Sequence, residues 1–477
     1  MPPHHPTSVR AEAKTKLLET LVAASPNDRR DFVLSLIAGR EARLPVREDA
    51  TEDHPGQPTY ILRSSRTRPL TDWMQAPPDE PPIDLRGAVL DGVNLDAVDL
   101  RSVNLAGASL HGSVLRGADL RGVCLEGADL SGADLAGARF DGAAMEKADL
   151  SEATCEDASF NQSSLRFVRA TKGVFEGADL RAAELWGADL SRAVLSDADL
   201  RGTVIRDADF RGADLSRARF AGASVGPANF DDAVLTGADL REASLSEVSL
   251  RRAVLTNARL SSVTLTGCTL EHACLAGAAL EDTQFDRVQV GSVVGEELAG
   301  DYGQAARAYL TLERCFNASG DQPSASWAYR KRRRMQKQAT QQRGRDAWRL
   351  GRWGEAAREY SVYFADEAAE WLCDYGESVP RVLATMVVVY FGFMFMYVTT
   401  ESIVRVEQVA GGTQQMTTSS LVDAAIFSLM AMTTSGSPAV VLQPASERVH
   451  ALTGVQALLG IALTGLLGFV LGNRIRR

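Results

Sequence analysis

A period of five residues runs from Ile83 to Val290 without insertion or deletion. Every fifth residue from Leu85 onward is apolar in all 42 units, mostly Leu or Phe, and the residue two places before it is small, except for Ile83. This period fits neither the 3.6 residues of a helix nor the 2 of a long strand. Each unit must therefore contain a short extended segment and a turn, so the chain coils.

The unit also predicts how a core forms. One large and one small residue per unit point inward, while the other three positions, largely Asp, Arg, Ser, Gly, Asn and Glu, face water. Stacked coils then bury a continuous core that no single unit could bury alone. Successive coils are expected to hydrogen-bond as strands about 4.8 Å apart.

Runs such as GADLSGADLAGARF (127–140) resemble the pentapeptide-repeat family, and this resemblance covers residues 83–290, called the rod below. It implies a right-handed quadrilateral β-helix with four units per coil. The rod would then have roughly ten coils and a length of about 50 Å. It is expected to act as a scaffold that docks cytoplasmic proteins. The alternative is an acidic DNA mimic, which some family members use against topoisomerases.

Composition excludes several classes of protein. The net charge is −10, and six cysteines and six histidines are scattered over the chain, with neither a disulfide framework nor metal-ligand spacing. A nucleic-acid partner is not expected from this charge. No nucleophile, base and orienting group stand at a plausible spacing, so we expect neither an enzyme nor a cofactor. The mean hydropathy of −0.10 resembles that of a soluble protein but averages over segments of opposite character.

Two segments precede the rod. Residues 1–45 are predicted to be an N-terminal helical segment, whose second helix is introduced by Ser25–Asp28. Residues 46–82 form a polar linker that contains prolines. No apolar secretory segment stands at the start, so this end is expected in the cytoplasm.

The period breaks after the rod, and helical patterns follow. Two helices joined by a turn at Gly320–Pro323 predict a helical hairpin over 295–345. Its basic run Arg330–Arg334 is interpreted as a solvated or lipid-facing surface. Aromatic and charged side chains are interleaved over 350–378, which favours an amphipathic helix at a membrane interface.

Residues 379–477 read as a membrane module. Segment 380–400, which carries no charge from Val382 onward, and segment 449–473 are long and apolar enough to span a bilayer. Between them, a helix predicted over 421–433 is too short to span, and the loop 434–439 breaks it. Irregular backbone at membrane depth requires protein or a water-filled path around it, so this segment is predicted to be re-entrant.

The flanking charges predict the orientation of the module. Arg381 precedes the first span, and Arg474, Arg476 and Arg477 follow the last. Positive flanks belong on the cytoplasmic side. We therefore expect a multi-pass protein of the cell membrane with both termini in the cytoplasm.

The segment Phe427–Gly436, placed between two spans, resembles the pore helix and filter of the two-span pore domain of tetrameric, potassium-channel-like ion channels. Asp374–Glu377 also resembles the lead-in found where this pore follows pentapeptide repeats. The resemblance implies a homotetramer in the lipid bilayer. Carbonyls and Thr hydroxyls of the loop would replace the water shell of an ion. The residues assigned to this ion pathway are Thr433, Thr434, Ser435, Gly436, Ser437 and Pro438.

The loop departs from the potassium signature Thr-x-Gly-Tyr-Gly-Asp. It reads Thr-Ser-Gly-Ser-Pro-Ala over 434–439. Pro438 fixes its φ near −65° and lacks an N–H, so it cannot replace a glycine there. Potassium, non-selective cation and anion permeation, and a closed pore, all remain open.

Three further residues have predicted roles in this module. A bend at Gly460 or Gly465 could gate the pathway, although glycines in a membrane helix also serve packing alone. Asp423 either caps the re-entrant helix or shapes the local field. The function expected is a tetrameric ion channel whose cytoplasmic rod docks partners or transmits a gating signal. The alternatives are a non-conducting, membrane-anchored scaffold and, third, a DNA mimic with a membrane tail.

Overall fold

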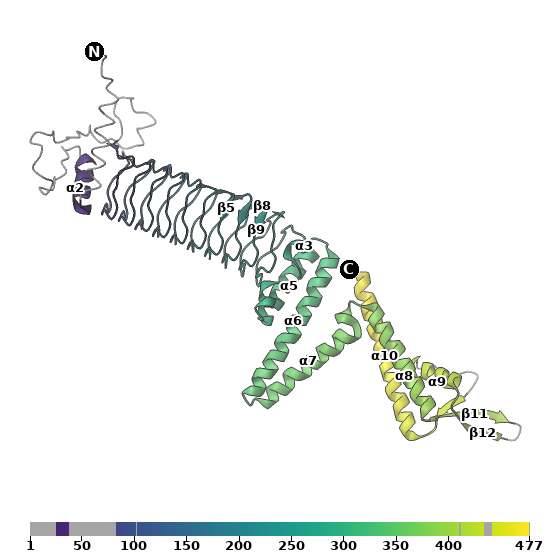
Figure 1. Cartoon of the computed structure of the whole chain (residues 1–477). Coiled ribbons are helices and arrows are strands. Elements are labelled where there is room, and N and C mark those ends of the chain that lie inside the picture. Colours follow the sequence, from purple (N-terminus) through teal and green to yellow (C-terminus); the bar gives the residue numbers. More distant parts are fainter. Residues whose placement is uncertain (1–24, 38–82, 102, 410–411, 434–440, 477) are drawn as a thin grey trace, which may run out of the picture. The chain divides into compact units, whose positions relative to one another are not determined.

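The computed structural model describes residues 25–37, 83–101, 103–409, 412–433 and 441–476 (Figure 1). The chain divides into two compact units, residues 1–325 and 326–477. In the predicted N-terminal segment 1–45, the structure describes helix α2, Pro26–Ile37. The earlier helical pattern of that segment and the linker 46–82 lie outside the described residues.

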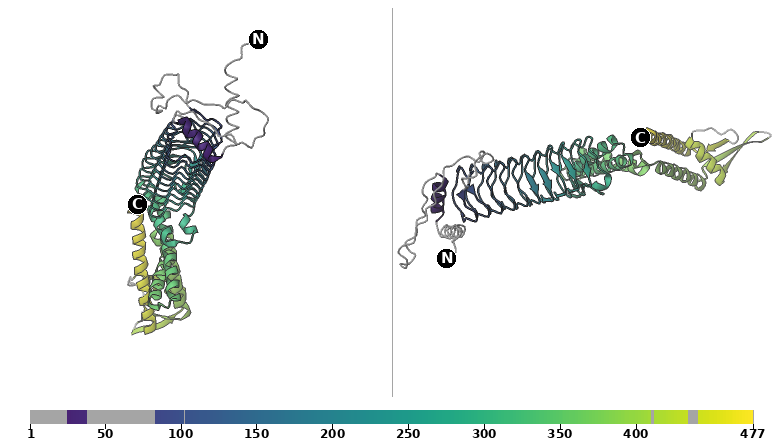
Figure 2. Two further views of the ribbon diagram at one scale, coloured as in Figure 1. Left: turned by 90° about the vertical axis from the view of Figure 1, so that its left-hand side faces the viewer. Right: turned by 90° about the horizontal axis from the view of Figure 1, so that it is seen from above.

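The rod is a β-solenoid of about nine turns, and its coils are stacked along one axis in Figure 2. Parallel bridges join residues 20 apart, from Val89↔Ser109 to Thr264↔Gln284, so four units make one coil. One face forms a five-stranded sheet with the order β10-β8-β6-β4-β3. Its strands are β3 Glu184–Trp186, β4 Val204–Arg206, β6 Ser224–Val225, β8 Ser244–Ser246 and β10 Leu265–Thr266. The shorter strands are β1 Ile83–Asp84 with β2 Val103–Asn104, and β5 Ala208–Asp209 with β7 Ala228–Asn229 and β9 Val248–Ser249.

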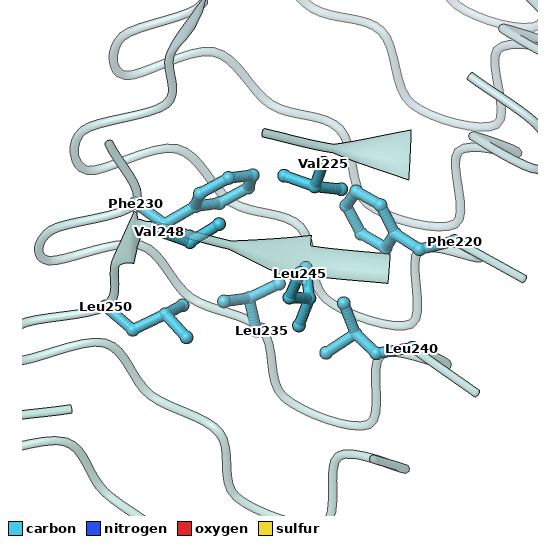
Figure 3. A pocket seen from close by; sticks show the side chains of 8 residues that line it. All are labelled: Phe220, Val225, Phe230, Leu235, Leu240, Leu245, Val248 and Leu250. Atoms are coloured by element: carbon cyan, nitrogen blue, oxygen red, sulfur yellow. The ribbon is translucent and has the colours of Figure 1, made fainter. Parts of the chain in front are cut away.

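The inward positions of the units form the core. The large residue of every unit from Leu85 to Leu280 is buried. Rings 20 residues apart stack, with centroids 4.9 Å apart for Phe140 and Phe160. A small apolar cavity of about 10 Å³ adjoins Val225 and is shown in Figure 3. The predicted alternation of large and small inward residues is therefore present in the structure.

Tight turns close the corners of each coil. The N–H of Ala88 donates to the Leu85 carbonyl at 3.0 Å, and Gly87 between them has a φ of 70°. A positive φ at the third residue is the geometry of a type II turn, which favours glycine. Phe167 occupies the same position with a φ of 55°, a conformation that is costly for a bulky side chain.

The rod ends before its sequence period does. Helix α3, Arg287–Val290, replaces the last unit, and the solenoid has about nine turns where roughly ten are expected. The Gln289 amide donates to the Leu265 and Cys268 carbonyls at 2.6 and 2.8 Å. Helix α4, Gly295–Leu298, follows, and Glu296 Oε1 accepts from the Ala276 N–H at 2.7 Å. These side chains satisfy main-chain groups that the last coil would otherwise expose as a sheet edge.

Helix α5, Tyr302–Ala318, packs beside this end of the rod. Phe316 lies 5.4 Å from Phe285, centroid to centroid. The Tyr309 hydroxyl donates to Glu297, and burial is the main cause that raises its pKa. Because the apolar end of a solenoid must be covered, α3, α4 and α5 together form its C-terminal cap.

The second unit is mainly helical. Its elements are α6 Gln322–Arg349, α7 Trp353–Cys373, η2 Asp374–Gly376, α8 Val379–Thr399, β11 Ile403–Val409, β12 Gly412–Thr418, α9 Leu421–Thr433, β13 Val441–Pro444 and α10 Glu447–Arg476. The three strands form an antiparallel sheet in the order β12-β11-β13, which the sequence did not indicate. Helix α6 starts near the expected place but extends beyond the predicted hairpin boundary at 345.

Candidate membrane module and ion pathway

Two helices of the second unit are long and apolar enough to cross a membrane. These are α8 and residues 447–472 of α10, each with a mean hydropathy of 2.0 over its most apolar stretch. Only 17% and 22% of those stretches are buried within the chain. Phe391, Phe395 and Leu458, for example, expose between half and about two thirds of their surface. Such apolar surface requires a cover of lipid or of further protein.

The third apolar helix, α9, is too short to span and packs against both long helices. Its buried residues Ala424 and Phe427 form a cluster with Tyr397 of α8. At its N-terminal end, buried Asp423 accepts from Thr418 Oγ1 at 2.9 Å and lies 3.6 Å from Arg405. Asp423 therefore fixes the start of α9 against the sheet β12-β11-β13, and Ser420 Oγ accepts from its N–H.

The C-terminal end of α9 lies level with the middle of both long helices. Ser428 Oγ donates to the Tyr390 carbonyl at 3.0 Å, and Tyr390 is near the midpoint of α8. A Cβ on Gly460 would stand 2.1 Å from the Met432 carbonyl oxygen, and Gly460 is near the midpoint of the apolar part of α10. Helix α9 thus begins near one end of α8 and α10 and ends about half-way along them.

The proposed pathway is described only at its first residue. Thr433 ends α9 with an exposed side chain, whose hydroxyl donates to the Leu429 carbonyl at 2.8 Å. The other five assigned residues, and the rest of the loop 434–439, lie outside the described residues. In α10, Gly460 has a close packing contact that the sequence did not indicate, whereas no atom of another described segment lies within 4 Å of the place where a Cβ on Gly465 would stand. A bend at either glycine stays a prediction.

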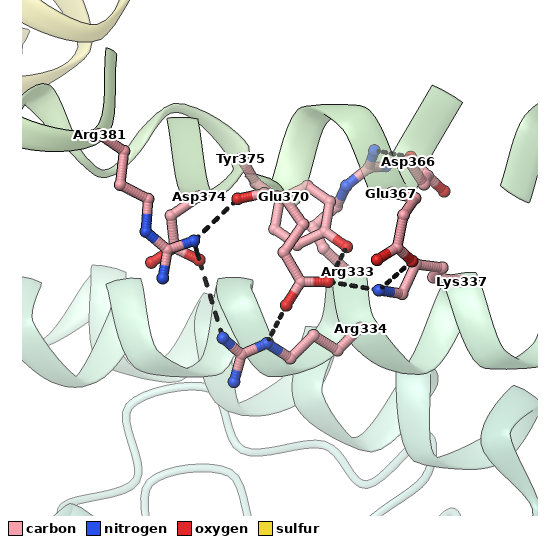
Figure 4. Close-up of polar contacts among 9 residues, drawn as sticks. All are labelled: Arg333, Arg334, Lys337, Asp366, Glu367, Glu370, Asp374, Tyr375 and Arg381. Atoms are coloured by element: carbon pink, nitrogen blue, oxygen red, sulfur yellow. Dashed lines mark hydrogen bonds and ion pairs between the residues drawn. The ribbon is translucent and has the colours of Figure 1, made fainter. Parts of the chain in front are cut away.

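A network of ion pairs joins α6 and α7 (Figure 4). Arg333 lies 2.6 Å from Asp366, Arg334 lies 2.8 Å from Glu370, and Lys337 lies 2.5 Å from Glu370. Part of the basic run therefore faces an acidic helix, which differs from a purely solvated or lipid-facing surface. The sequence feature that could have indicated these ion pairs is a set of basic residues at helical spacing in α6 followed by a set of acidic residues at helical spacing in α7.

The same network reaches the start of α8. The buried carboxylate of Asp374 lies 3.6 Å from Arg330, 3.8 Å from Arg334 and 3.8 Å from Arg381. Arg381 also donates to the Glu370 carbonyl at 2.8 Å. The lead-in segment therefore holds the basic and acidic helices and the first apolar helix together at one carboxylate.

The family model for pentapeptide repeats matches in eight copies, over residues 83–226 and 228–267. The chain is a pentapeptide-repeat protein. No curated protein matches it. All residues matched by the family model lie in the rod.

Several solved structures are similar to this pentapeptide-repeat protein. HetL, a pentapeptide repeat protein involved in heterocyst differentiation regulation from the cyanobacterium Nostoc sp. strain PCC 7120, is 30% identical over 45% of this chain and 92% of its own, with a TM-score of 0.33. QnrB1, a plasmid-mediated fluoroquinolone resistance protein, is 21% identical over 43% of this chain and 97% of its own, with a TM-score of 0.26. Rfr23 from the cyanobacterium Cyanothece 51142 is 21% identical over 31% and 91%, with a TM-score of 0.15.

One face of this pentapeptide-repeat protein carries paired charges. Arg181 is the main cause that holds the pKa of Asp179 below its usual range, and their charged atoms lie 2.6 Å apart. The same two-residue spacing joins Asp99 to Arg101 at 2.7 Å and Asp199 to Arg201 at 2.6 Å. A mimic of DNA phosphates needs a row of uncompensated negative charge, so this face gives the DNA-mimic alternative no support.

Another face carries an exposed aromatic patch, Phe167 and Trp186 with Arg166 and Arg206. The two aromatic side chains are 48% and 40% exposed. The guanidinium carbons of Arg166 and Arg206 lie 4.9 and 6.0 Å from the Trp186 ring centre, and its indole N–H donates to Asp207 at 3.2 Å. Trp and Arg are the residues most enriched at the energetic centres of protein interfaces.

In the residues that the structure describes, no group of three or more His, Cys, Asp or Glu side chains could hold a metal ion. The cysteines among these residues are free thiols. Burial raises the pKa of Cys274 and of Cys315 to about 11, so these thiols stay protonated at neutral pH.

Proposed function

We propose that this protein is a homotetrameric ion channel of the cell membrane, with both termini and the rod in the cytoplasm. The observation that carries the proposal is the position of α9, which packs between two apolar helices and ends level with their middle. A helix that stops there aims its partly negative carbonyl end at the membrane centre, where it stabilises a cation.

The exposed surfaces of α8 and α10 support assembly of several copies. One chain supplies one half-helix and one loop, whereas an ion coordinated by carbonyls needs a ring of them. Apolar side chains that stay exposed in one chain would be covered by neighbouring copies and by lipid. The number four comes from the resemblance to tetrameric pore domains.

The ion-coordinating loop in this proposal is 434–439, with Thr433 at its entrance. The helix end favours cations over anions, and the Ser-Pro-Ala sequence after Gly436 favours poor discrimination between potassium and sodium. The rod would dock a cytoplasmic protein, for which the aromatic patch at Trp186 is the best-supported surface, or transmit a gating signal through α6 and α7.

The experiment is reconstitution of the full chain into planar bilayers. We expect single-channel currents whose reversal potential follows the cation gradient, measured in KCl, in NaCl and under unequal chloride concentrations. A Gly436→Trp variant that folds and inserts should lose the current. Folded, inserted wild-type protein that carries no current under any ionic condition would refute conduction.

The second candidate is a membrane-anchored scaffold, and the exposed aromatic patch of the rod is the observation that favours it. A scaffold would keep its biological effect in the Gly436→Trp variant and lose it in a Trp186→Ala variant. A channel would instead lose its biological effect in the Gly436→Trp variant, because that variant blocks the current.

A further inference from the structure

We infer that Tyr397, Ser428 and Gln456 form a hydrogen-bonded clasp that positions the C-terminal half of α9 and thereby sets the ion selectivity of the pathway. The inference rests on the proposed channel function and deepens it, because it assigns a positioning role to residues outside the pore loop. Tyr397 and Gln456 lie outside the segment Phe427–Gly436, and Ser428 lies in its helical part, before the loop 434–439.

The clasp links one side chain from each of the three apolar helices. The Tyr397 hydroxyl donates to Gln456 Oε1 at 2.8 Å. Gln456 Nε2 donates to Ser428 Oγ at 2.7 Å and lies 3.1 Å from the Ser428 carbonyl oxygen. Ser428 Oγ donates in turn to the Tyr390 carbonyl at 3.0 Å. The chain of bonds therefore runs from α8 through α10 to α9 and back to α8.

All three side chains are fully buried. Tyr397, Ser428 and Gln456 each have a relative exposure of 0%. Phe in place of Tyr397, Ala in place of Ser428 and Leu in place of Gln456 would fill similar space without a buried polar group. Packing alone therefore does not explain why these three polar residues are present. A buried polar network that is satisfied only in one arrangement specifies that arrangement, because every displacement leaves a donor or acceptor without a partner.

A second contact fixes the same register. Gln456 and Gly460 lie one turn apart on α10, and they meet Ser428 and Met432, one turn apart on α9. Since a Cβ at Gly460 would stand 2.1 Å from the Met432 carbonyl oxygen, only glycine permits this approach. Helix α9 can neither slide nor rotate on α10 without breaking the Gln456 bonds or colliding at Gly460.

The position of α9 matters for ions because its last residues lead into the loop. Thr433 follows Met432 directly, so the clasp sets where the loop starts and where the helix carbonyls point. A loop that must hold several oxygens at ion-coordinating distance is sensitive to small displacements of its support. Weakening the clasp should therefore change which ions pass.

The main test uses Gln456→Leu and Tyr397→Phe in the full chain, with Thr399→Val as the matched control. Thr399 also lies on α8, but among the described residues its hydroxyl donates to the Met396 carbonyl of its own helix and not to another helix. We expect the potassium-to-sodium permeability ratio to change at least about threefold in Gln456→Leu, less in Tyr397→Phe, and not in the control. The double variant should equal Gln456→Leu, because both single changes remove one shared bond. Folded, conducting variants with the wild-type ratio would overturn the inference.

A second measurement does not need conduction. A Thr433→Cys variant is labelled with a water-soluble thiol reagent, with and without Gln456→Leu, and the wild-type chain measures the background from its own thiols. The clasp predicts an at least about threefold change in labelling rate at position 433, whereas an unchanged rate contradicts it. If the wild-type chain carries no current but this rate changes, the channel proposal fails while the positioning role of the clasp stands.

Discussion

Val225 leaves space in the core of the rod that the units around it do not fill. Its side chain is smaller than the Leu or Phe of most units, and it lies between Phe220 and Phe230 in Figure 3. The cavity beside it is lined by Phe220, Val225, Phe230, Leu235, Leu240, Leu245, Val248 and Leu250. At about 10 Å³ it is close to the smallest space that holds one water molecule, but its lining is apolar, so it stays empty.

Val225→Leu should therefore stabilise the rod. One additional methylene buried in existing space contributes about 0.8 kcal/mol to the free energy of unfolding. Chemical denaturation of the full chain, followed by circular dichroism, measures this change. Ile205→Leu is the matched control, since Ile205 occupies the same row one coil earlier, is fully buried and does not line the cavity. An equal gain in both variants would mean that the cavity is not the cause.

Glu296 gives the cap of the rod a pH dependence. Its side chain is 6% exposed, Oε1 accepts from the Ala276 N–H, and Oε2 has no hydrogen-bond partner among the residues that the structure describes. Burial raises the pKa of this carboxyl above its ordinary value of 4.5. A raised pKa means that the folded cap favours the protonated form, so its contribution to stability is present below 4.5 and is lost as pH rises through the raised pKa.

Glu296→Gln should remove this dependence, because the amide keeps the acceptor and carries no charge at any pH. We expect the variant to gain stability over the wild type at pH 7 by about 1 kcal/mol and to match it near pH 4. Thermal unfolding at a series of pH values measures the difference. Glu176→Gln, at an exposed position of the rod, should show no such trend. If Glu296→Gln and Glu176→Gln both showed the same change of stability between pH 4.5 and 7 as the wild type, Glu296 would not be the cause of the pH dependence.

At the scale of elements, the pairing of α6 with α7 depends on Glu370. Burial acts to raise the pKa of this carboxyl, but the hydrogen bonds and charges of Lys337 and Arg334 more than offset it and hold the pKa below its usual range. A lowered carboxyl pKa contributes stability above the ordinary value of 4.5, which is lost as pH falls through the lowered pKa.

Glu370→Gln should weaken the helix pair at neutral pH and reduce the additional loss in acid. We expect the unfolding midpoint to fall by about 2 to 4 °C at pH 7, as a change near 1 kcal/mol implies for a folded unit of the size of residues 326–477. Differential scanning calorimetry at pH 7 and at pH 3 tests both statements. The control is Glu355→Gln, because that carboxylate, on the same helix, forms an exposed pair with Arg352 at 3.5 Å. An equal fall of the unfolding midpoint in Glu355→Gln would show that the loss of any one carboxylate charge, and not the loss of the ion pairs of Glu370, is responsible.

The sequence predicted the positions of the helices of the membrane module better than it predicted the contacts that the helices of this unit make. Uncharged stretches located α8, α9 and α10 to within a few residues, because length and lack of charge are local properties. The ion pairs of α6 and α7 join residues about 30 positions apart, so no local pattern fixes them. Strands β11 and β12 went without prediction although Val404 and Val406 alternate with polar residues, since such a short run with charges is weak evidence for a strand.

At the candidate site, the sequence indicated residue types but not contacts. The loop and Thr433 were singled out by a motif. Tyr397 and Gln456 lie in no motif, and Ser428 lies in the helical part of the segment that resembles a pore helix. A polar residue within an apolar helix shows only that some partner must exist. Gly460 was noted as a hinge candidate, whereas its contact with Met432 depends on the helix crossing, which sequence spacing does not reveal.

For the whole molecule, charge and hydropathy separate along the chain. The rod contains 32 acidic and 21 basic residues, and therefore a net charge of −11, while the remaining residues together carry +1. The apolar helices near the C-terminus offset the polar faces of the rod, which explains the mean hydropathy of −0.10. A single average could not distinguish this chain from an ordinary soluble protein.

The solenoid makes the stability of the rod nearly one-dimensional, and this gives the last prediction. Each coil contacts its two neighbours only, so removing one whole coil deletes one repeat and leaves all other contacts in register. Deletion of residues 118–137 joins Gly117 to Ala138 and keeps both the unit of five and the coil of 20. We expect cooperative unfolding with a midpoint within about 3 °C of the full rod, measured by circular dichroism on the full chain.

Deletion of residues 118–139 is the matched control, since it removes only two residues more. It joins Gly117 to Phe140 and leaves 18 residues for a coil that needs 20. A chain too short for its perimeter cannot place both the large and the small residue inward, so the junction should become sensitive to proteolysis and the midpoint should fall well below that of the first deletion. Equal stability of the two variants would mean that the 20-residue register does not hold the rod together.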